Sequence, residues 1–280
     1  MRTNSKVKAF KKIFARETES KKTLEIARVS DLIEKGFAAD ILANEFIKIN
    51  KEVWGGITNS QYIWTKEMLL GQFQICPQNL YCAFENGKIV ATLTTLFTTE
   101  AFLKKNKSWF EKTGNGFLTT HIPDGDVGFG VDLSVLRGAS KKVSDRIVFA
   151  AIFICIIGDG LKTGYLGARI PSYYKHKHMK VEDYVFGRRK SGKPLDPELY
   201  FYQKLGFEIV EIISEYTEDP ESLNYGVLIR WNNPLYKITK KLPFLKSIIK
   251  YIGKKIFIRV PELPHKITKK LDEHPTEKFI

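Results

Sequence analysis

Apolar and polar residues alternate along several short stretches of the chain, and this pattern predicts β-strands. In the clearest stretch, residues 126–135, side chains of alternate residues should point to opposite faces of a sheet. Asn86-Gly87 separates two other stretches and is a strong hairpin signal. The predicted strands are 23–29, 80–84, 88–97, 126–135, 165–170, 208–214 and 225–231. Within 126–135 one face would carry Val127, Phe129, Val131, Leu133 and Val135, and the other Gly128, Gly130, Asp132 and Ser134.

Apolar residues that recur every three or four positions predict helices at 31–50, 60–73, 143–157 and 197–205. Ser30-Asp31 offers N-cap side chains to the first of these, and Gly158-Asp159-Gly160 ends the third. The strand-helix-strand unit at 126–170 predicts a parallel strand pair joined by a crossover helix. We therefore expect an α/β fold with a central mixed sheet and helices on both faces.

The charge of the chain divides it into three parts. Of a net charge of +14, residues 1–22 contribute +6 and residues 235–280 contribute +8, so the segment between them is neutral. We expect a basic N-terminal arm at 1–22, one folded domain at 23–233 and a basic amphipathic extension at 234–280. A domain that binds nucleic acid normally carries a basic surface of its own, so we expect no such binding by the core.

The extension has a composition that suits an anionic membrane surface. Residues 235–255 hold seven lysines and no acidic residue, and their apolar residues recur at helical spacing. A helix packed on the domain, or on a partner in a homodimer, fits the same pattern. The longest apolar run, 147–157, is shorter than the roughly 20 residues that a bilayer requires. With no secretory signal and three scattered cysteines, we expect a cytoplasmic protein, peripheral at the membrane if the extension binds there.

Two stretches resemble the GNAT acetyltransferase family. Phe201–Glu208 (FYQKLGFE) is similar to a late motif of that family, FYxKxGFE, and Gly130–Val135 is similar to its central strand. A narrower set of residues resembles a GNAT subgroup often fused to carbon-nitrogen hydrolases. That set includes Arg169-Ile170-Pro171, Tyr174-Lys175-His176, Asp196-Pro197, Tyr225-Gly226 and Trp231-Asn232. The resemblance implies an N-acetyltransferase that takes acetyl-CoA or another acyl-CoA and acylates a small-molecule or protein amine.

The same resemblance implies roles for particular residues. Tyr202 falls at the position of the family's general acid, and backbone N–H groups of 133–135 would bind the oxyanion. The family usually continues with a loop of pattern R/Q-x-x-G-x-G/A that binds the CoA diphosphate, but this chain lacks the second and third small residues. The alternative function is therefore a GNAT-like binding module without catalysis. The cofactor-binding candidates are Leu133, Ser134, Val135, Arg137, Gly138, Ser140, Lys141 and Lys142.

The other candidates come from the residues themselves. Asp132 is a candidate general base because it shares its predicted face with two glycines and Ser134. An aspartate bonded to its neighbours fits as well, just as Tyr202 fits simple packing on Phe207. We expect no metal, because no carboxylate cluster accompanies His121, His176 and His178. Aromatic residues of the segment before the last predicted helix either form the wall of an acceptor pocket or belong to an ordinary covering loop. The candidate wall residues are Tyr173, Tyr174 and Tyr184.

Overall fold

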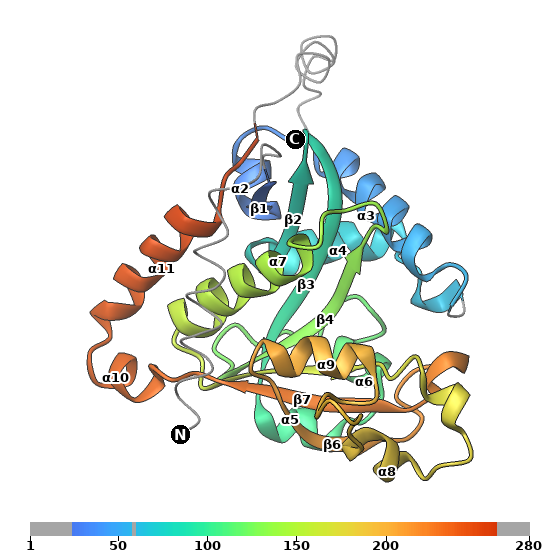
Figure 1. Cartoon of the computed structure of the whole chain (residues 1–280). Coiled ribbons are helices and arrows are strands. Elements are labelled where there is room, and N and C mark those ends of the chain that lie inside the picture. Colours follow the sequence, from blue (N-terminus) through green and yellow to red (C-terminus); the bar gives the residue numbers. More distant parts are fainter. Residues whose placement is uncertain (1–23, 58–59, 262–280) are drawn as a thin grey trace.

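A computed structural model describes residues 24–57 and 60–261 of the chain (Figure 1). The basic arm predicted at 1–22 lies outside these residues, as does the end of the predicted extension, 262–280. The described residues form a central sheet flanked by helices, with the last long helix, α11, lying along one side of the molecule.

The sheet has seven strands in the order β1-β2-β3-β4-β5-β7-β6. Only β4 and β5 run parallel; every other neighbouring pair is antiparallel. The predicted mixed sheet is thus confirmed, including the parallel pair and its crossover helix. The strands are β1 (Leu24–Arg28), β2 (Leu80–Glu85), β3 (Lys88–Thr98), β4 (Val127–Val135), β5 (Thr163–Ala168), β6 (Glu208–Ile213) and β7 (Gly226–Asn232).

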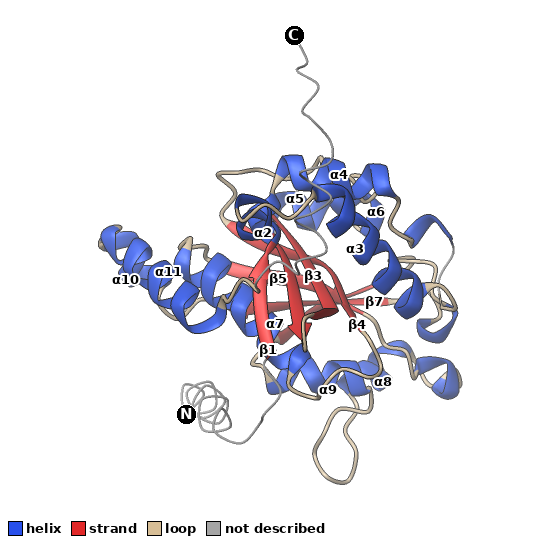
Figure 2. Ribbon diagram, turned by 90° about the horizontal axis from the view of Figure 1, so that it is seen from above, coloured by secondary structure: helices blue, strands red, loops and turns tan. Residues whose placement is uncertain are grey.

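Helices cover both faces of the sheet and create two apolar cores (Figure 2). On one face lie α2 (Val29–Glu34), α3 (Ala39–Trp54), α4 (Lys66–Ile75), α5 (Glu100–Lys105) and α6 (Trp109–Thr113). On the other lie α7 (Val143–Ala151), the π-helix η3 (Ile152–Gly158), α8 (Val181–Phe186), α9 (Pro197–Lys204) and α11 (Phe244–Phe257), preceded by α10 (Tyr236–Lys241). Short 3-10 turns are η1 (Ser60–Tyr62), η2 (Pro77–Asn79), η4 (Tyr173–His176) and η5 (Pro220–Ser222).

Several helices differ from the predicted ones. The helix predicted at 31–50 is two helices, because the chain turns at Gly36, whose φ is +94°, a conformation that favours glycine. The helix predicted at 60–73 begins later, at α4, where the Thr65 side chain accepts a hydrogen bond from the Met68 N–H. The segment between β3 and β4 contains α5 and α6, and the segment between β5 and α9 contains η4 and α8, none of which was predicted.

The helix predicted at 143–157 changes its winding at Ile152. Residues Val143–Ala151 are α-helical, and Ile152–Gly158 follow as a π-helix. Such wider turns are rare and are frequently found at functional sites. The apolar residues of both segments pack on the sheet, and the change in winding was not predicted.

The first part of the basic extension packs on the domain. Phe257 and Gly253 of α11 are buried, and the Phe257 ring lies 5.6 Å from the ring of Phe153 in η3. The backbone N–H of Arg259 donates to Ile26 of β1 over 2.8 Å. One face of α11 is therefore part of the folded unit.

Candidate functional site

Strands β4 and β5 part in the middle of the sheet. Their parallel ladder runs from Val127–Thr163 to Gly130–Leu166 and stops there. Beyond that point β4 stays paired with β3 as far as Val135, while β5 stays paired with β7 as far as Ala168. The two strands thus separate after Gly130, and each remains paired with its outer neighbour.

A β-bulge in β4 coincides with this opening. Thr94 of β3 lies opposite Asp132, but Thr95 lies opposite Gly130, so Val131 is one extra residue in β4. The extra residue shifts the alternation of side chains by one position. Val131 still packs in the core under α3, whereas Leu133 packs in the core under α7. The prediction that all five apolar residues of β4 share one face is therefore wrong.

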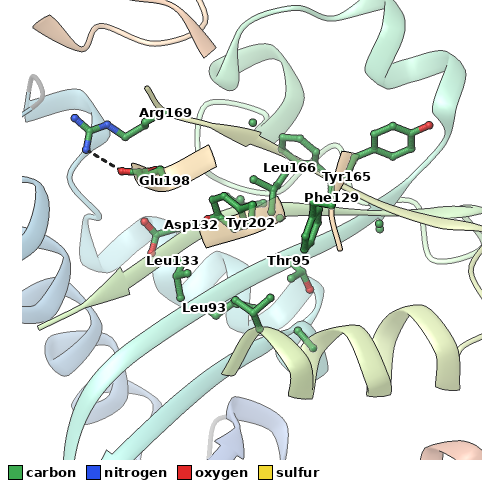
Figure 3. Close-up of a pocket in the computed structure, with 18 of the residues that line it drawn as sticks. Leu93, Thr95, Phe129, Asp132, Leu133, Tyr165, Leu166, Arg169, Glu198 and Tyr202 are labelled. Carbon is green, nitrogen blue, oxygen red and sulfur yellow. Dashed lines mark ion pairs between the residues drawn. The ribbon is translucent and has the colours of Figure 1, made fainter. Parts of the chain in front are cut away.

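A cavity of about 470 Å³ passes through the gap and reaches both faces of the sheet. On the α3 face its walls are largely aromatic, and on the α7 face they are largely aliphatic. Figure 3 shows Asp132, Glu198 and Tyr202 grouped at one end and Phe129, Leu166 and Thr95 at the other. On the α3 face the lining residues include Trp54, Tyr62, Trp64, Trp109 and Tyr216; on the α7 face they include Val148, Ala151, Ile152, Cys155 and Ile156.

Asp132 faces this cavity from the α3 side because of the bulge. Its carboxylate accepts hydrogen bonds from the Trp54 indole N–H (2.9 Å) and the Ser134 hydroxyl (2.9 Å), and no ion pair with a described basic residue offsets its charge. Burial raises the pKa of Asp132 to about 7, against the effect of these two hydrogen bonds. The two interpretations of Asp132, a carboxylate hydrogen-bonded to its neighbours and a group that can take up a proton near neutral pH, are therefore compatible.

Trp54 connects Asp132 to a cluster of charges at the cavity wall. The guanidinium of Arg169 lies 5.2 Å from the centre of a Trp54 ring, within the range of a cation–π contact. Arg169 also donates two hydrogen bonds to Asp219, at 2.7 and 2.9 Å, and one to Glu221 at 2.8 Å. These carboxylates fix the position of the Arg169 guanidinium and neutralise its positive charge. Arg169 therefore does little to stabilise the ionised form of Asp132.

Glu198 is a cavity residue that the sequence did not single out. It lies on α9, 3.6 Å from Arg169, and 35% of its side chain is exposed. Desolvation of its carboxylate in the cavity wall raises the pKa of Glu198 to about 7, although the positive charge of Arg169 lowers it. The available signal was its spacing: Glu198 precedes Tyr202 by four residues, which places both on the same side of a helix.

Tyr202 lines the cavity from α9 and also packs on Phe207, with ring centroids 5.5 Å apart. Both readings of this residue are therefore compatible with one position. Within the described chain its hydroxyl has no hydrogen-bond partner. Burial raises the pKa of Tyr202 well above its ordinary value, and the nearby charges of Glu198 and Asp132 add to that shift. The hydroxyl therefore keeps its proton at neutral pH.

The predicted cofactor residues occupy different environments. Leu133 and Val135 line the cavity, whereas the buried Ser134 hydroxyl is bonded to Asp132. Arg137 and Gly138 are exposed in the turn that follows β4, and Lys141 is exposed just before α7. Lys142 stands at the N-cap of α7 and gives no side-chain cap. The backbone N–H of Ser140 points to the carboxylate of Glu85 over 3.2 Å, so this one donor is already used.

These surroundings fit an anionic group at the start of α7, but only in part. A helix N-terminus without a side-chain cap leaves N–H groups that attract anions, and three basic residues are nearby. A side chain added at Gly138 would meet nothing within 4 Å, so the turn is open on that side. Glu85 opposes the attraction from the Ser140 side.

The three tyrosines predicted to wall an acceptor pocket do not line the described cavity. Tyr184 is fully buried, and its hydroxyl donates to Asp196 over 3.0 Å. Tyr173 is buried beside it and donates to the carbonyl of Met179, while Tyr174 is exposed beside Lys175. Aromatic residues that line the α3 face of the cavity come from α3, η1, the loop between η1 and α4, α6 and the loop after β6.

Histidine 121 has a structural contact of its own. Its Nδ1 accepts a hydrogen bond from the backbone N–H of Phe97 over 3.0 Å, and burial lowers its pKa. No group of three or more metal-binding side chains occurs within residues 24–57 and 60–261.

Comparison with known proteins identifies relatives of this chain. An uncharacterised N-acetyltransferase, YkwB of Bacillus subtilis, is 30% identical over 196 residues, which cover 68% of this chain and 84% of that protein. A probable hydrolase of the same organism, YhcX, is 26% identical over 76% of this chain but only 42% of its own length. No family model matches the chain.

Solved structures show the same fold. The loading GNATL domain of CurA from Lyngbya majuscula has a TM-score of 0.60 and 19% identity over 76% of this chain and 98% of that domain. The GphF GNAT-like decarboxylase in complex with isobutyryl-CoA has a TM-score of 0.57 and 20% identity over 75% of this chain and 98% of its own. At these identities the likeness concerns the fold alone.

The raised pKa of Asp132 implies that the free energy of unfolding depends on pH. Because the folded protein holds this proton up to about pH 7 and the unfolded chain releases it near pH 4, Asp132 should weaken the fold progressively as pH rises between these values. Asp132→Asn keeps an oxygen for Trp54 and Ser134 but has no charge to bury. In urea unfolding at pH 5 and pH 8, the free energy of unfolding of the variant relative to wild type should therefore be higher at pH 8. An equal difference at both pH values would contradict the buried-carboxylate interpretation.

Proposed function

The chain belongs to the GNAT acetyltransferase family, and we propose that it transfers the acyl group of an acyl-CoA thioester to an amine through the gap between β4 and β5. The observation that carries the proposal is the cavity that crosses the sheet there. A donor and an acceptor entering from opposite faces would meet at the gap without competing for the same walls. Bringing two reactants together in this way is itself a large part of catalysis.

The free edge of β4 beyond Gly130 supports this placement. Residues 131–135 pair with β3 on one side only, so alternate backbone groups of this segment face away from β3. A backbone N–H fixed beside the gap would stabilise the oxyanion that develops on a thioester carbonyl. Arg137, Lys141 and the N-terminus of α7 would hold the diphosphate of the donor.

Two side chains on opposite sides of the gap would move the protons. Asp132, directly or through water, accepts a proton from the ammonium form of the acceptor, so that the neutral amine can attack the acyl carbon. A C–N bond forms, the C–S bond breaks, and the departing sulfur receives a proton from the hydroxyl of Tyr202. Asp132 returns its proton to solvent, and the nitrogen that has attacked releases its second proton through water to the Tyr202 phenolate, so both residues end the cycle unchanged. The thioester supplies the activated acyl group, and the chain supplies position and proton transfer.

Donor binding can be tested without knowledge of the acceptor. Acetyl-CoA and longer acyl-CoAs should raise the melting temperature of the purified protein, because a ligand that binds only the folded state stabilises it. Arg137→Glu/Lys141→Glu should raise the Kd for CoA about tenfold, equivalent to about 1.4 kcal/mol. Lys177→Glu/Lys190→Glu makes the same charge change at exposed positions elsewhere and should leave the Kd unchanged. Absence of binding by every donor would favour the alternative of a binding module without CoA.

Catalysis is tested by release of free thiol from an acyl-CoA in the presence of a panel of primary amines. The wild-type kcat/KM should rise with pH around a midpoint of about 7, because only the ionised form of Asp132 accepts a proton. Asp132→Asn should remove that pH dependence and lower kcat/KM by about 10²–10⁴. Tyr202→Phe should lower kcat while leaving the Kd for the donor close to wild type. Full activity in both variants would reject the proposed proton transfers.

We also propose that the outer face of α10 and α11 binds an anionic membrane surface. No described helix is long and apolar enough to cross a membrane, so the contact would be superficial. Phe244 and Tyr251 are 60% and 59% exposed, which is unusual for aromatic side chains on a helix with a buried opposite face. Lysines flank these residues, and their positive charge is complementary to anionic lipids. The exposed apolar residues of this surface are Ile238, Leu242, Phe244, Ile248, Tyr251 and Ile252.

Co-sedimentation with vesicles tests this surface. Wild type should bind vesicles that contain phosphatidylserine and should not bind vesicles of phosphatidylcholine alone. Phe244→Ser/Tyr251→Ser should reduce binding about tenfold, since burial of aromatic area is lost while every lysine remains. Ile33→Ser/Ile41→Ser removes exposed apolar side chains from other helices and serves as the matched control. Equal binding by all three proteins, or a switch from dimer to monomer in the α11 variant, would reject the membrane proposal.

A further inference from the structure

The cavity does not end at the gap but continues along the α7 face of the sheet. There it runs past β4 to Phe97 of β3 on one side and to Trp231 of β7 on the other. Gly128, Gly130 and Gly164 lie side by side in the middle of this floor, since Gly128 pairs with Gly164 and Gly130 is two residues further along β4. We call this part of the cavity the α7-side chamber. The surface of the sheet is recessed at the floor of the chamber, because these three neighbouring residues have no side chain.

The roof of the α7-side chamber is made by the helix that changes its winding. Val148 and Ala151 come from α7, and Ile152, Cys155 and Ile156 come from the π-helix η3. The extra residue per turn of a π-helix alters which side chains face the sheet. On the outer side of η3, Gly253 of α11 lies so close that an added Cβ would be 2.6 Å from the Phe153 ring. The extension thus supports the roof from behind.

The far end of the chamber is closed by Ile156. A Cβ added to Gly128 would lie 2.6 Å from its Cδ1, and one added to Gly164 would lie 3.1 Å from the same atom. Ile156 therefore rests directly on the glycine floor. Ala151 and Ile156 both line the cavity, so their side chains bound the space that a chain entering from the gap can occupy.

The walls of the chamber carry no charge within the described part of the chain. The charged residues that line the cavity are Asp132, Arg169 and Glu198, and they lie toward the other face or at the gap. Polar side-chain groups on the α7 side come from Thr95, Ser144, Tyr202 and Trp231. Cys155 is not a reactive thiol, because burial raises its pKa to about 11 and its sulfur is bonded to the Tyr81 hydroxyl over 3.0 Å. A ligand in this chamber meets hydrocarbon on nearly every side.

We propose that the α7-side chamber is an acyl subsite, and that the preferred donor carries an aliphatic acyl chain of several carbons rather than an acetyl group. This inference rests on the proposed acyl transfer at the gap. A thioester carbonyl placed beside the free edge of β4 directs its acyl chain along the glycine floor toward Ile156. An acetyl group would leave the apolar walls of the chamber without contacts, whereas each methylene buried there strengthens binding about fourfold. The gain in affinity per methylene ends at the acyl-chain length that reaches Ile156.

Binding measurements with a series of donors test the proposal, since they need no acceptor. Calorimetric titration with CoA and with acetyl-, butanoyl-, hexanoyl-, octanoyl- and decanoyl-CoA should show a Kd that falls about sixteenfold per two carbons and then stops falling. Ile156→Ala should move this limit to longer chains. Ala151→Leu should move it to shorter chains, because the new side chain occupies the chamber. Ile75→Ala makes the same truncation as Ile156→Ala at a residue of α4 that is 38% exposed and should leave the profile unchanged.

The outcomes separate this inference from the proposed function. If CoA and every acyl-CoA fail to bind, the acyl-transfer proposal itself fails. If CoA binds but acetyl-CoA binds as tightly as the longer donors, and Ile156→Ala leaves the profile unchanged, the chamber is not an acyl subsite and the inference is overturned. The two chamber variants act in opposite directions, so a general loss of stability in one of them cannot imitate the expected pair of shifts.

Discussion

One extra residue in β4 determines the chemistry of the whole site. In a regular strand Asp132 would point to the same face as Gly128 and Gly130, under the apolar roof of α7. The bulge at Val131 turns Asp132 to the opposite face, where its carboxylate accepts a hydrogen bond from the indole N–H of Trp54. The bulge also accompanies the end of the parallel ladder at Gly130. The opening in the sheet and the carboxylate beside it are thus two results of the same irregularity.

The electrostatics of the site depend on which charges are already compensated. Arg169 is the basic residue that lines the cavity, and its bonds to Asp219 and Glu221 hold its guanidinium. Asp132 therefore receives only neutral donors, and burial dominates its pKa. Across the gap, burial and the charges of Glu198 and Asp132 keep the proton on Tyr202. In the proposed mechanism Asp132 accepts a proton near neutral pH and Tyr202 donates one, which is the division of roles that acyl transfer to an amine requires.

The sequence predicted the sheet well because its signals there are local and redundant. Alternation identified the strands, Asn86-Gly87 identified the β2–β3 hairpin, and the apolar helix between two strands implied the parallel pair. The bulge left no such signal, since Val131 and Leu133 are both apolar and suit either core. Glu198 looked like an ordinary charged residue in the first turn of a helix. The tyrosines of 173–184 looked like a binding wall because a sequence does not reveal that a hydroxyl such as that of Tyr184 is satisfied inside the protein.

The extension after β7 links the proposed acyl subsite to the proposed membrane surface. Its α11 presses Gly253 and Phe257 against Phe153 of the π-helix, and Lys250 forms an ion pair with Asp159 just beyond that helix. The opposite face of α11 carries Phe244 and Tyr251 in solvent. A single helix therefore has one face on the roof of the chamber and the other directed outward. Acyl-CoAs with longer chains are themselves amphiphilic, so a chamber for such donors and a surface for lipid membranes favour the same surroundings. Under these two proposals, the lysines of α10 and α11 bring the protein to the surface where such donors collect, and they take no part in the transfer itself.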